Sequence, residues 1–402
     1  MIDNGDTPQD KEQAEVSLPT AARHFLLGLL AITGAQAQAS ALNFRDNCDF
    51  ACEAAYRASF AIDLRSRVNV DLSIDPFYAN PANLSNFAVG DVNPQGKDKP
   101  FRTGPFALAQ AGYAVIAPDY AGQGSDIPQG FMYESGALHA ADVVHGLHAA
   151  RQVIGQQLSD DWVVVGHSKG GLTAWRTNER EAKADKKTKG LVGVVSVAPA
   201  LRPLKLIPES FRRANGGPLG DVVSIIVLQA ISKLYPSIKV EDYVSDIVAS
   251  RIPASNLGCL RTGGTIFGSL TETQLYKNTS WLTHPDVVDW QERYNGAGLH
   301  QWAAPMLVVQ GMGDTLTYIE TMMEDFDATC KAFPDSPAQL YVYPELNHDP
   351  AFQASQADYL PWIADRFNKV PVATGCSKKT IEPATKTHSL TQQSWEAYLL
   401  GG

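Results

Sequence analysis

The chain has 402 residues, of which 44% are hydrophobic and 19% are charged, so it has enough apolar material to bury a large core. Its formal net charge of -10 excludes the clustered basic surface that nucleic-acid-binding proteins need. The five cysteines are spread too widely for a zinc site, so no metal is predicted; they are Cys48, Cys52, Cys259, Cys330 and Cys376.

The N-terminal residues show no strong strand pattern, and we expect a lead-in over 1–70. Within it, the apolar run at 25–34 (FLLGLLAITG) follows Arg23 and precedes small residues up to Ala39, which predicts a cleaved signal segment over 25–39. The run is too short to span a bilayer, so no stable membrane span is predicted. The residues before the run are acidic, which is unusual for a signal peptide, so an intracellular location is the alternative to secretion.

From residue 105 onward, short apolar runs rich in β-branched residues alternate with helical stretches. This alternation is typical of βαβ units, and runs that are apolar throughout fit strands buried on both faces of a parallel sheet. The predicted strands are 114–118, 162–166, 191–197, 306–310 and 339–343, and the predicted helices are 137–157, 170–184, 316–333 and 355–368. We therefore expect an α/β core, a mostly parallel sheet flanked by helices, over 71–200 and 305–376, with a C-terminal tail over 377–402.

A long insertion, residues 201–304, separates the third and fourth of these predicted strands. It contains apolar helix candidates of its own at 221–234 and 241–250. A segment of this length is not a simple crossover, and the chain returns to the sheet pattern after it. We interpret the insertion as a helical cap or lid, in preference to a separate downstream domain.

A G-x-S-x-G motif, Gly166-His167-Ser168-Lys169-Gly170, lies between the predicted strand that ends at Gly166 and a predicted helix. In the α/β-hydrolase fold this context holds a serine on a sharp strand-to-helix turn at the carboxyl edge of the sheet. Glycines on both sides permit the close backbone approach that the turn requires. Ser168 is therefore the candidate nucleophile, and we expect His167 to point elsewhere.

A nucleophilic serine needs a base, and the base needs an acid to orient it. In this fold the acid and the base follow the serine in that order, each in a loop after a later strand. Asp314 follows the predicted strand at 306–310, and His348 follows the one at 339–343. Both residues thus stand where the fold places the acid and the base.

Each assignment has alternatives. Asp314 could be a turn or helix-capping residue, and His348 an ordinary loop histidine. Asp349 is the rival acid, and His300 or His284 is the rival base. Neither rival histidine follows a predicted strand, and Asp349 is adjacent to the candidate base.

Acyl transfer also needs N–H donors for the oxyanion. The residue after the nucleophile, Lys169, supplies one through its backbone N–H, and because only that N–H is needed, its side chain is expected to point to solvent. No His-Gly dipeptide precedes the helical region near residue 105. The remaining candidate donor is the backbone of Asp119, in the turn after the predicted strand at 114–118.

Several segments, in order, resemble the fungal secretory lipase family of the lipase A type. The resemblance covers most of residues 75–376. The segments that carry it are DPFYANPANLSNFAVGD (75–91), AGYAVIAPDYAGQGSD (111–126), WVVVGHSKGGLTAW (162–175), MLVVQGMGD (306–314), LNHDPAF (346–352) and DYLPWIADRF (358–367).

This resemblance implies the α/β-hydrolase fold with a helical cap. It implies a catalytic triad of Ser168, Asp314 and His348. It also implies that the backbone of Asp119 takes part in the oxyanion hole, because the family uses the aspartate of a PDY-type turn in this way.

The resemblance further implies a disulfide between Cys330 and Cys376, and a bond from Cys259 to a partner near the N-terminal part of the domain. In one respect the chain departs from the family. A long family segment, which holds the first strands and the partner of the cap cysteine, is replaced here by residues 92–104 alone. The first strands are therefore expected to be missing or rebuilt by residues 40–74, and Cys259 to be a free thiol or to pair with an N-terminal cysteine.

Together these observations predict a serine hydrolase that cleaves carboxylic esters, a lipase or esterase acting on apolar ester or lipid substrates through an acyl-enzyme. No metal or organic cofactor is implied, and the sequence does not predict an oligomeric state. One alternative is an acyltransferase or ester-modifying hydrolase of a biosynthetic pathway. The others are an inactive truncated homologue and, with less support, a peptidase.

Overall fold

The computed structural model describes residues 107–382, except for residues 110, 119, 124–126, 128, 186, 221–222 and 257–259. The predicted lead-in, the signal segment and the DPFY-like start lie outside the described residues. Cys48, Cys52, Cys259 and Asp119 also lie outside them.

The described strands form one parallel sheet of five strands in the order β1-β2-β3-β4-β5. Parallel pairing needs a crossover between successive strands, and helices supply most of these crossovers. The sheet confirms the expected α/β-hydrolase type of core. The strands are β1 (Trp162–His167), β2 (Leu191–Val197), β3 (Met306–Gly311), β4 (Ala338–Tyr343) and β5 (Cys376–Thr380).

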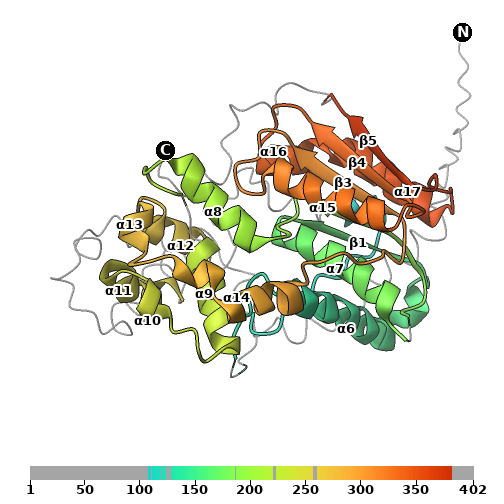
Figure 1. Ribbon diagram of the computed structural model, residues 1–402. Coiled ribbons are helices and arrows are strands. Elements are labelled where there is room, and N and C mark those ends of the chain that lie inside the picture. Colours follow the sequence, from blue (N-terminus) through green and yellow to red (C-terminus); the bar gives the residue numbers. More distant parts are fainter. Residues whose placement is uncertain are drawn as a thin grey trace, which may run out of the picture.

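Helices cover both faces of the sheet (Figure 1). Their bounds are α6 (Gly136–Ile154), η2 (Gly155–Gln157), α7 (Lys169–Lys183), α15 (Ile319–Ala332), α16 (His348–Ala354) and α17 (Gln356–Phe367). In the part of the chain that the structure describes, no helix has the length and apolar character needed to cross a membrane.

Alternation along the strands explains this layering, since successive side chains of a strand point to opposite faces. In β3, Met306 and Val308 pack with α7 and α15, whereas Leu307 and Val309 pack with α16 and α17. All four side chains are fully buried. A strand that is apolar at every position is therefore what a sheet covered on both faces requires.

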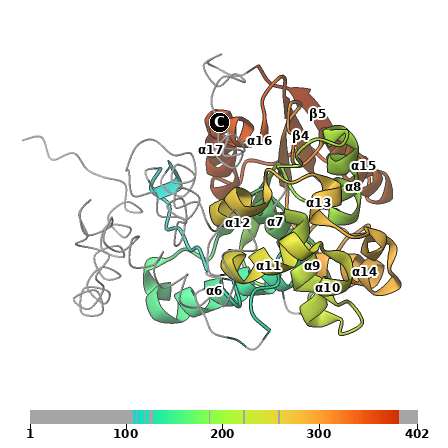
Figure 2. The ribbon, with the colours of Figure 1, turned by 90° about the vertical axis from the view of Figure 1, so that its left-hand side faces the viewer.

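The insertion between β2 and β3 is helical and has a hydrophobic core of its own, which includes the fully buried Trp281 and Trp290. It lies beside the sheet in Figure 1, and Figure 2 looks onto it. Its elements are α8 (Pro203–Ala214), α9 (Val223–Leu234), α10 (Val240–Tyr243), α11 (Asp246–Ser255), α12 (Leu260–Phe267), α13 (Glu272–Leu275), η3 (Ser280–Thr283), α14 (Pro285–Trp290) and η4 (Gln291–Asn295).

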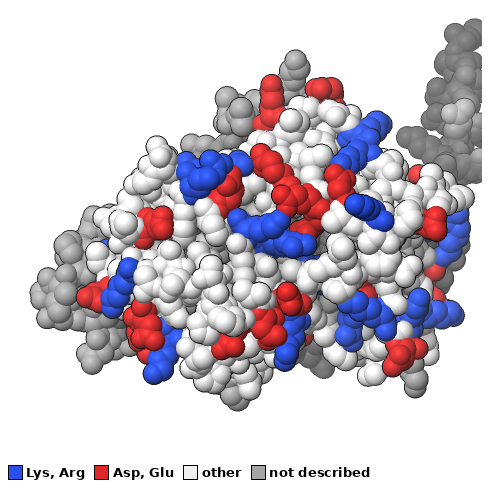
Figure 3. Space-filling model, in the orientation of Figure 1, with Lys and Arg blue, Asp and Glu red and all other residues white. Residues whose placement is uncertain are grey.

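A strip of ion pairs connects α8 of the insertion to α15 of the core. Figure 3 shows acidic and basic side chains gathered over these two helices. Because most of these groups are exposed, each pair contributes little by itself, and the strip mainly fixes how the two helices face each other. The pairs are Arg202–Asp325, Lys205–Glu324 and Arg213–Glu320.

Two expectations need correction. The run at 114–118, expected to be a strand, pairs with none of the described strands, and its Val115 and Ile116 are 41% and 38% exposed. A β-branched run fits a pleated surface, but a strand forms only where a neighbour completes the ladder. Conversely, the core does not end at residue 376, because β5 pairs with β4 through residues of the expected tail.

Cys330 in α15 and Cys376 in β5 form a disulfide, the pair that the family resemblance implied. The bond joins residues 46 positions apart and fastens β5, at one end of the strand order, to the helix layer.

Candidate active site

Ser168 occupies a turn between the end of β1 and the start of α7. Its backbone has φ 60° and ψ -121°, a left-handed conformation that costs free energy for any residue with a side chain. The Ser168 N–H donates to the carbonyl of Val197 at 2.9 Å. At Gly166 an added Cβ would lie 1.9 Å from the Gly170 carbonyl oxygen, so only glycine fits there. This is the sharp turn that the G-x-S-x-G motif predicted.

Asp314 and His348 meet beyond the carboxyl ends of β3 and β4. The distance between Asp314 Oδ2 and His348 Nδ1 is 2.8 Å, and both side chains are buried. A carboxylate at Nδ1 fixes the proton on that nitrogen and leaves Nε2 as the acceptor. The ring is thus oriented as a general base requires.

The Asp314 carboxylate is surrounded by donors from its own loop and from the end of β3. Oδ1 accepts the N–H groups of Leu316 and Thr317, both at 2.8 Å, and Oδ2 accepts the Thr317 hydroxyl at 2.8 Å and the Gln310 amide at 3.0 Å. Burial alone raises the pKa of Asp314, but His348 and these donors outweigh it and hold the pKa below its usual value. The carboxylate therefore stays ionised beside the imidazole.

The loops that carry Asp314 and His348 are joined through their backbones. Gly313 donates to the carbonyl of Leu346 at 3.0 Å, and an added Cβ on Gly311 would lie 2.2 Å from the same carbonyl oxygen. The Asn347 side chain accepts the His348 N–H at 2.7 Å and so begins α16 at the histidine. His348 is thus the first residue of a short helix and not part of a free loop.

His167 connects the serine turn to His348. Its ring centroid lies 4.5 Å from that of His348 and 4.7 Å from that of Phe352, and its Nε2 lies 3.3 Å from the His348 carbonyl oxygen. Burial, with a further contribution from His348, lowers the pKa of His167 well below its usual value, so the ring is neutral. The residue directly before Ser168 therefore packs on the candidate base.

The rival residues occupy other environments. Asp349 Oδ1 lies 3.8 Å from His167 Nε2, whereas Asp314 bonds His348 directly. His284 accepts the Asp286 N–H at the start of α14, in the insertion. Burial and nearby cations lower the pKa of His300 to about 4. Neither rival histidine contacts Asp314 in the interactions of the described residues.

A sequence model of the alpha/beta hydrolase family matches residues 99–360. This chain belongs to that family.

Comparison of solved structures agrees with this assignment. The alpha/beta hydrolase is similar to the X-ray structure of Candida antarctica lipase A, with a TM-score of 0.56 and 18% identity over 76% of this chain and 70% of that chain. It is also similar to a putative hydrolase from Legionella pneumophila subsp. pneumophila str. Philadelphia 1, with a TM-score of 0.55 and 14% identity over 65% of this chain and 72% of that one. At these identities the likeness shows the fold. A search of the curated proteins finds no match.

The side chain of Lys169 does not point to solvent, which corrects the expectation from the sequence. Its Nζ is buried and lies 3.8 Å from the ring centroid of Tyr120 and 4.7 Å from that of Phe131. Charge and side-chain length gave no hint of this, because the two rings lie about 40 to 50 residues earlier in the sequence and local patterns do not report such a contact. The other expected oxyanion donor, Asp119, lies outside the described residues.

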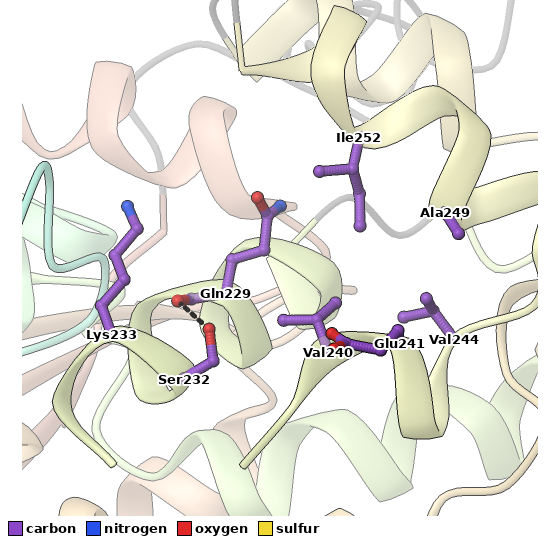
Figure 4. A pocket seen from close by; sticks show the side chains of 8 residues that line it. All are labelled: Gln229, Ser232, Lys233, Val240, Glu241, Val244, Ala249 and Ile252. Atoms are coloured by element: carbon purple, nitrogen blue, oxygen red, sulfur yellow. Dashed lines mark hydrogen bonds between the residues drawn. The ribbon is translucent and has the colours of Figure 1, made fainter. Parts of the chain in front are cut away.

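A cavity of about 250 Å³ lies among α9, α10 and α11 of the insertion (Figure 4). Its residues are mostly aliphatic on one side and polar on the other: Gln229, Ser232, Lys233, Val240, Glu241, Val244, Ala249 and Ile252. Lys233 donates to the carbonyl of Phe131 at 3.3 Å, so the cavity adjoins the segment that surrounds Lys169. Of the two helices predicted in the insertion, the one at 221–234 corresponds to α9, whereas the one at 241–250 is divided between α10 and α11. The cavity was not predicted from the sequence.

One group of side chains has metal-ligand atoms close together in the described part of the chain. These atoms of His167, His348 and Asp349 lie within 4.8 Å of one another. His348 already bonds Asp314 through Nδ1, and the His167 ring packs against the His348 ring. The arrangement is suited to orienting and transferring a proton.

Proposed function

We propose that this alpha/beta hydrolase cleaves carboxylic esters, with Ser168 as nucleophile, His348 as general base and Asp314 as the acid that orients the base. The observation that carries the proposal is the buried Asp314–His348 contact, which lies next to the turn that holds Ser168. The packing of the His167 ring against that of His348, at 4.5 Å between centroids, supports the same arrangement.

In the proposed mechanism, His348 Nε2 takes the proton of the Ser168 hydroxyl as its oxygen attacks the ester carbonyl carbon. The backbone N–H groups of Lys169 and Asp119 stabilise the oxyanion. The alcohol leaves with the proton held by His348, and an acyl-enzyme remains. Water then attacks the acyl carbon while His348 takes its proton, and the carboxylic acid leaves as the Ser168 oxygen is protonated again.

Esters with apolar acyl groups are the substrates that we propose, and lipids are included among them. The aliphatic side of the cavity, formed by residues such as Val240, Val244 and Ile252, supports this choice.

We further propose that the protein is a secreted enzyme of the fungal secretory lipase type. The segments quoted above support the family type. The Cys330–Cys376 disulfide supports an oxidising compartment.

Hydrolysis of a series of p-nitrophenyl esters tests the proposal. The wild type should hydrolyse them, and Ser168→Ala should reduce kcat by about 10⁶, as for other triads. Ser159→Ala is the matched control, because that hydroxyl bonds only the nearby Asp161 carbonyl in an exposed turn, and it should retain full activity. Wild-type activity in Ser168→Ala would contradict the proposal.

A further inference from the structure

The lysine that follows the proposed nucleophile is enclosed by aromatic rings. Lys169 Nζ lies over the faces of Tyr120 and Phe131, at 3.8 and 4.7 Å from their centroids, with Tyr133 at 5.8 Å. A cation over an aromatic face is attracted by the ring quadrupole, and more strongly where water is excluded. We call Tyr120, Phe131 and Tyr133 the aromatic cage.

The position is an unfavourable one for a lysine. Lys169 is the first residue of α7, where the helix dipole disfavours positive charge. Burial of its ammonium also carries a desolvation cost. Oxyanion binding needs only the backbone N–H of this residue, and almost any side chain would provide that. A charged side chain held here against both costs indicates a role for the charge itself.

The aromatic cage is attached to α7 at a second point. The Tyr120 hydroxyl donates to Thr173 Oγ1 at 3.2 Å, and Thr173 Oγ1 donates to the Lys169 carbonyl at 3.1 Å. On the other side, the ring of His139 from α6 packs on Tyr120 at 4.3 Å and on Phe131 at 5.4 Å. The segment of the cage is thus held between the two helices.

A buried carboxyl accompanies the lysine. Glu134 is 2% exposed, and it adopts φ 57°, a left-handed conformation unusual for a residue with a side chain. The positive charge of Lys169 acts on this carboxyl and opposes the effect of burial on its pKa. The Glu134 carbonyl accepts the Asn295 amide at 3.0 Å, which also joins this point to the end of the insertion.

We propose that Lys169 is a positioning residue for the oxyanion hole. Its ammonium, held in the aromatic cage, fixes the segment that begins at Tyr120 against the first turn of the nucleophile helix. Tyr120 directly follows Asp119, the proposed second oxyanion donor, in the sequence, so we expect a displaced Tyr120 to displace that donor as well. This inference rests on the proposed function, and it adds a role for a side chain that the ester-hydrolase reaction does not itself require.

Kinetics of Lys169→Met on a short-chain p-nitrophenyl ester test the proposal. Methionine keeps the length of the side chain and removes the charge. Removal of one oxyanion donor lowers kcat by about 10²–10³ in other enzymes, so a displaced donor should lower kcat by about 10- to 100-fold. KM should change little, because the loss occurs in the transition state. Lys169→Arg should restore most of kcat, since arginine also binds aromatic faces.

A double-mutant cycle separates this role from a general loss of stability. Tyr120→Leu removes one face of the cage and should lower kcat in the same way. In combination with Lys169→Met the two losses should be far from additive, because both variants break one interaction. The matched control is Lys183→Met, an exposed lysine at the far end of the same helix, which should leave kcat unchanged. Circular dichroism confirms that each variant is folded.

The outcomes are distinguishable. A folded Lys169→Met with wild-type kcat, or additive losses in the cycle, would overturn this inference and leave the proposed function intact. If Lys169→Met does not fold, wild-type kcat in a folded Tyr120→Leu overturns it instead. A wild type that neither hydrolyses esters nor reacts with a fluorophosphonate would overturn the proposed function, and this inference with it.

Discussion

Asp314 takes part in more hydrogen bonds than orientation of a histidine alone needs. Its two oxygens accept from the backbone, a hydroxyl and an amide as well as facing His348. These bonds hold the carboxylate in place independently of His348, whose own position is fixed by Asn347 and by the backbone bond between the two loops.

Asp314→Asn therefore tests the role of the acid at this site. An amide presents a donor as well as an acceptor, so it no longer holds the Nδ1–H tautomer of His348, and kcat should fall by up to about 10⁴ with little change in KM. The control is Asp349→Asn, which alters the neighbouring carboxylate near His167 and should have a much smaller effect. A larger loss in the control would transfer the role of the acid to Asp349.

Glu134 predicts a pH dependence of stability. Burial raises its pKa to about 8, and the charge of Lys169 opposes this shift only in part. An unfolded glutamate has a pKa of about 4.3, so the folded state holds the proton more tightly. The resulting stabilisation is complete below the unfolded pKa and is lost as the pH rises towards the folded value.

Urea denaturation of the wild type and Glu134→Gln at several pH values measures this effect. Because glutamine does not titrate, the wild type should lose stability relative to the variant by about 1 kcal/mol per pH unit between about pH 5 and pH 8. A difference between the two proteins that is constant over this range would show that Glu134 is not buried as a neutral acid.

For Lys169, the sequence predicted the position of the backbone but not the contacts of the side chain. The motif placed its backbone correctly in the strand-to-helix turn, because that depends on neighbours in sequence. Its side chain was expected in solvent, but it lies among rings of the 120–133 segment, which is distant in sequence. Local patterns carry no information about such a contact.

At the scale of the element, α7 does more than present Ser168. Arg176 donates to the carbonyls of Asn295 and Leu201, at 3.0 and 3.4 Å. Asn178 accepts the N–H groups of Ala303 and Ala304 and donates to the Ala304 carbonyl. Both ends of the helical insertion are thus bonded to the helix that carries the nucleophile.

Asn178→Ala should therefore destabilise the protein. The variant leaves the buried Ala304 N–H without its acceptor, which costs about 1–3 kcal/mol, whereas the Ala303 N–H keeps the backbone carbonyl of Asn178 at 3.2 Å. Urea denaturation should show a lower midpoint, whereas Arg180→Ala, a change at an exposed residue of the same helix, should stay within about 0.5 kcal/mol. Equal midpoints for the two variants would mean that the insertion does not depend on this anchor.

The strands show which elements an apolar sequence pattern can predict and which it cannot. β1 to β4 were predicted within a residue or two, because each is buried on both faces and is apolar almost throughout. β5 was missed, since it lies at the end of the strand order and contains the exposed Lys378 and Lys379. Lysine is typical of edge strands, where it discourages pairing with other chains. Edge strands therefore give no apolar signal.

At the scale of the whole molecule, the Cys330–Cys376 disulfide fastens this polar edge strand. It closes a loop between residues 46 positions apart, and the chain-entropy model gives a stabilisation of about 4 kcal/mol for such a loop. The pairing was implied by resemblance to a family and not by spacing, since spacing alone leaves several connectivities open.

Cys376→Ser should lower the free energy of unfolding by about 2–5 kcal/mol. Addition of dithiothreitol should destabilise the wild type by a similar amount and leave the variant unchanged. An equal response of both proteins to the reductant would mean that another cysteine pair supplies the stabilisation. A peptide map without reduction would also test the prediction that Cys259 is a free thiol.

The arrangement of the whole molecule brings together three loops at the carboxyl edge of one parallel sheet, after β1, β3 and β4. The order of Ser168, Asp314 and His348 along the chain predicted this meeting, because the carboxyl ends of parallel strands share one edge. The cavity in the insertion could not be predicted in the same way. It depends on how α9, α10 and α11 pack, and their apolar patterns specify burial but not packing geometry.

The most direct test of the account is to map the residue that a fluorophosphonate modifies. Tryptic cleavage after Arg151 and Lys169 yields a peptide, residues 152–169, that contains both Ser159 and Ser168. Fragmentation of this peptide from labelled wild type should place the adduct on Ser168, and His348→Ala should abolish labelling because the hydroxyl then lacks its base. An adduct on Ser159 or elsewhere in the chain, or undiminished labelling of Ser168→Ala, would contradict the assignment of Ser168 as the nucleophile.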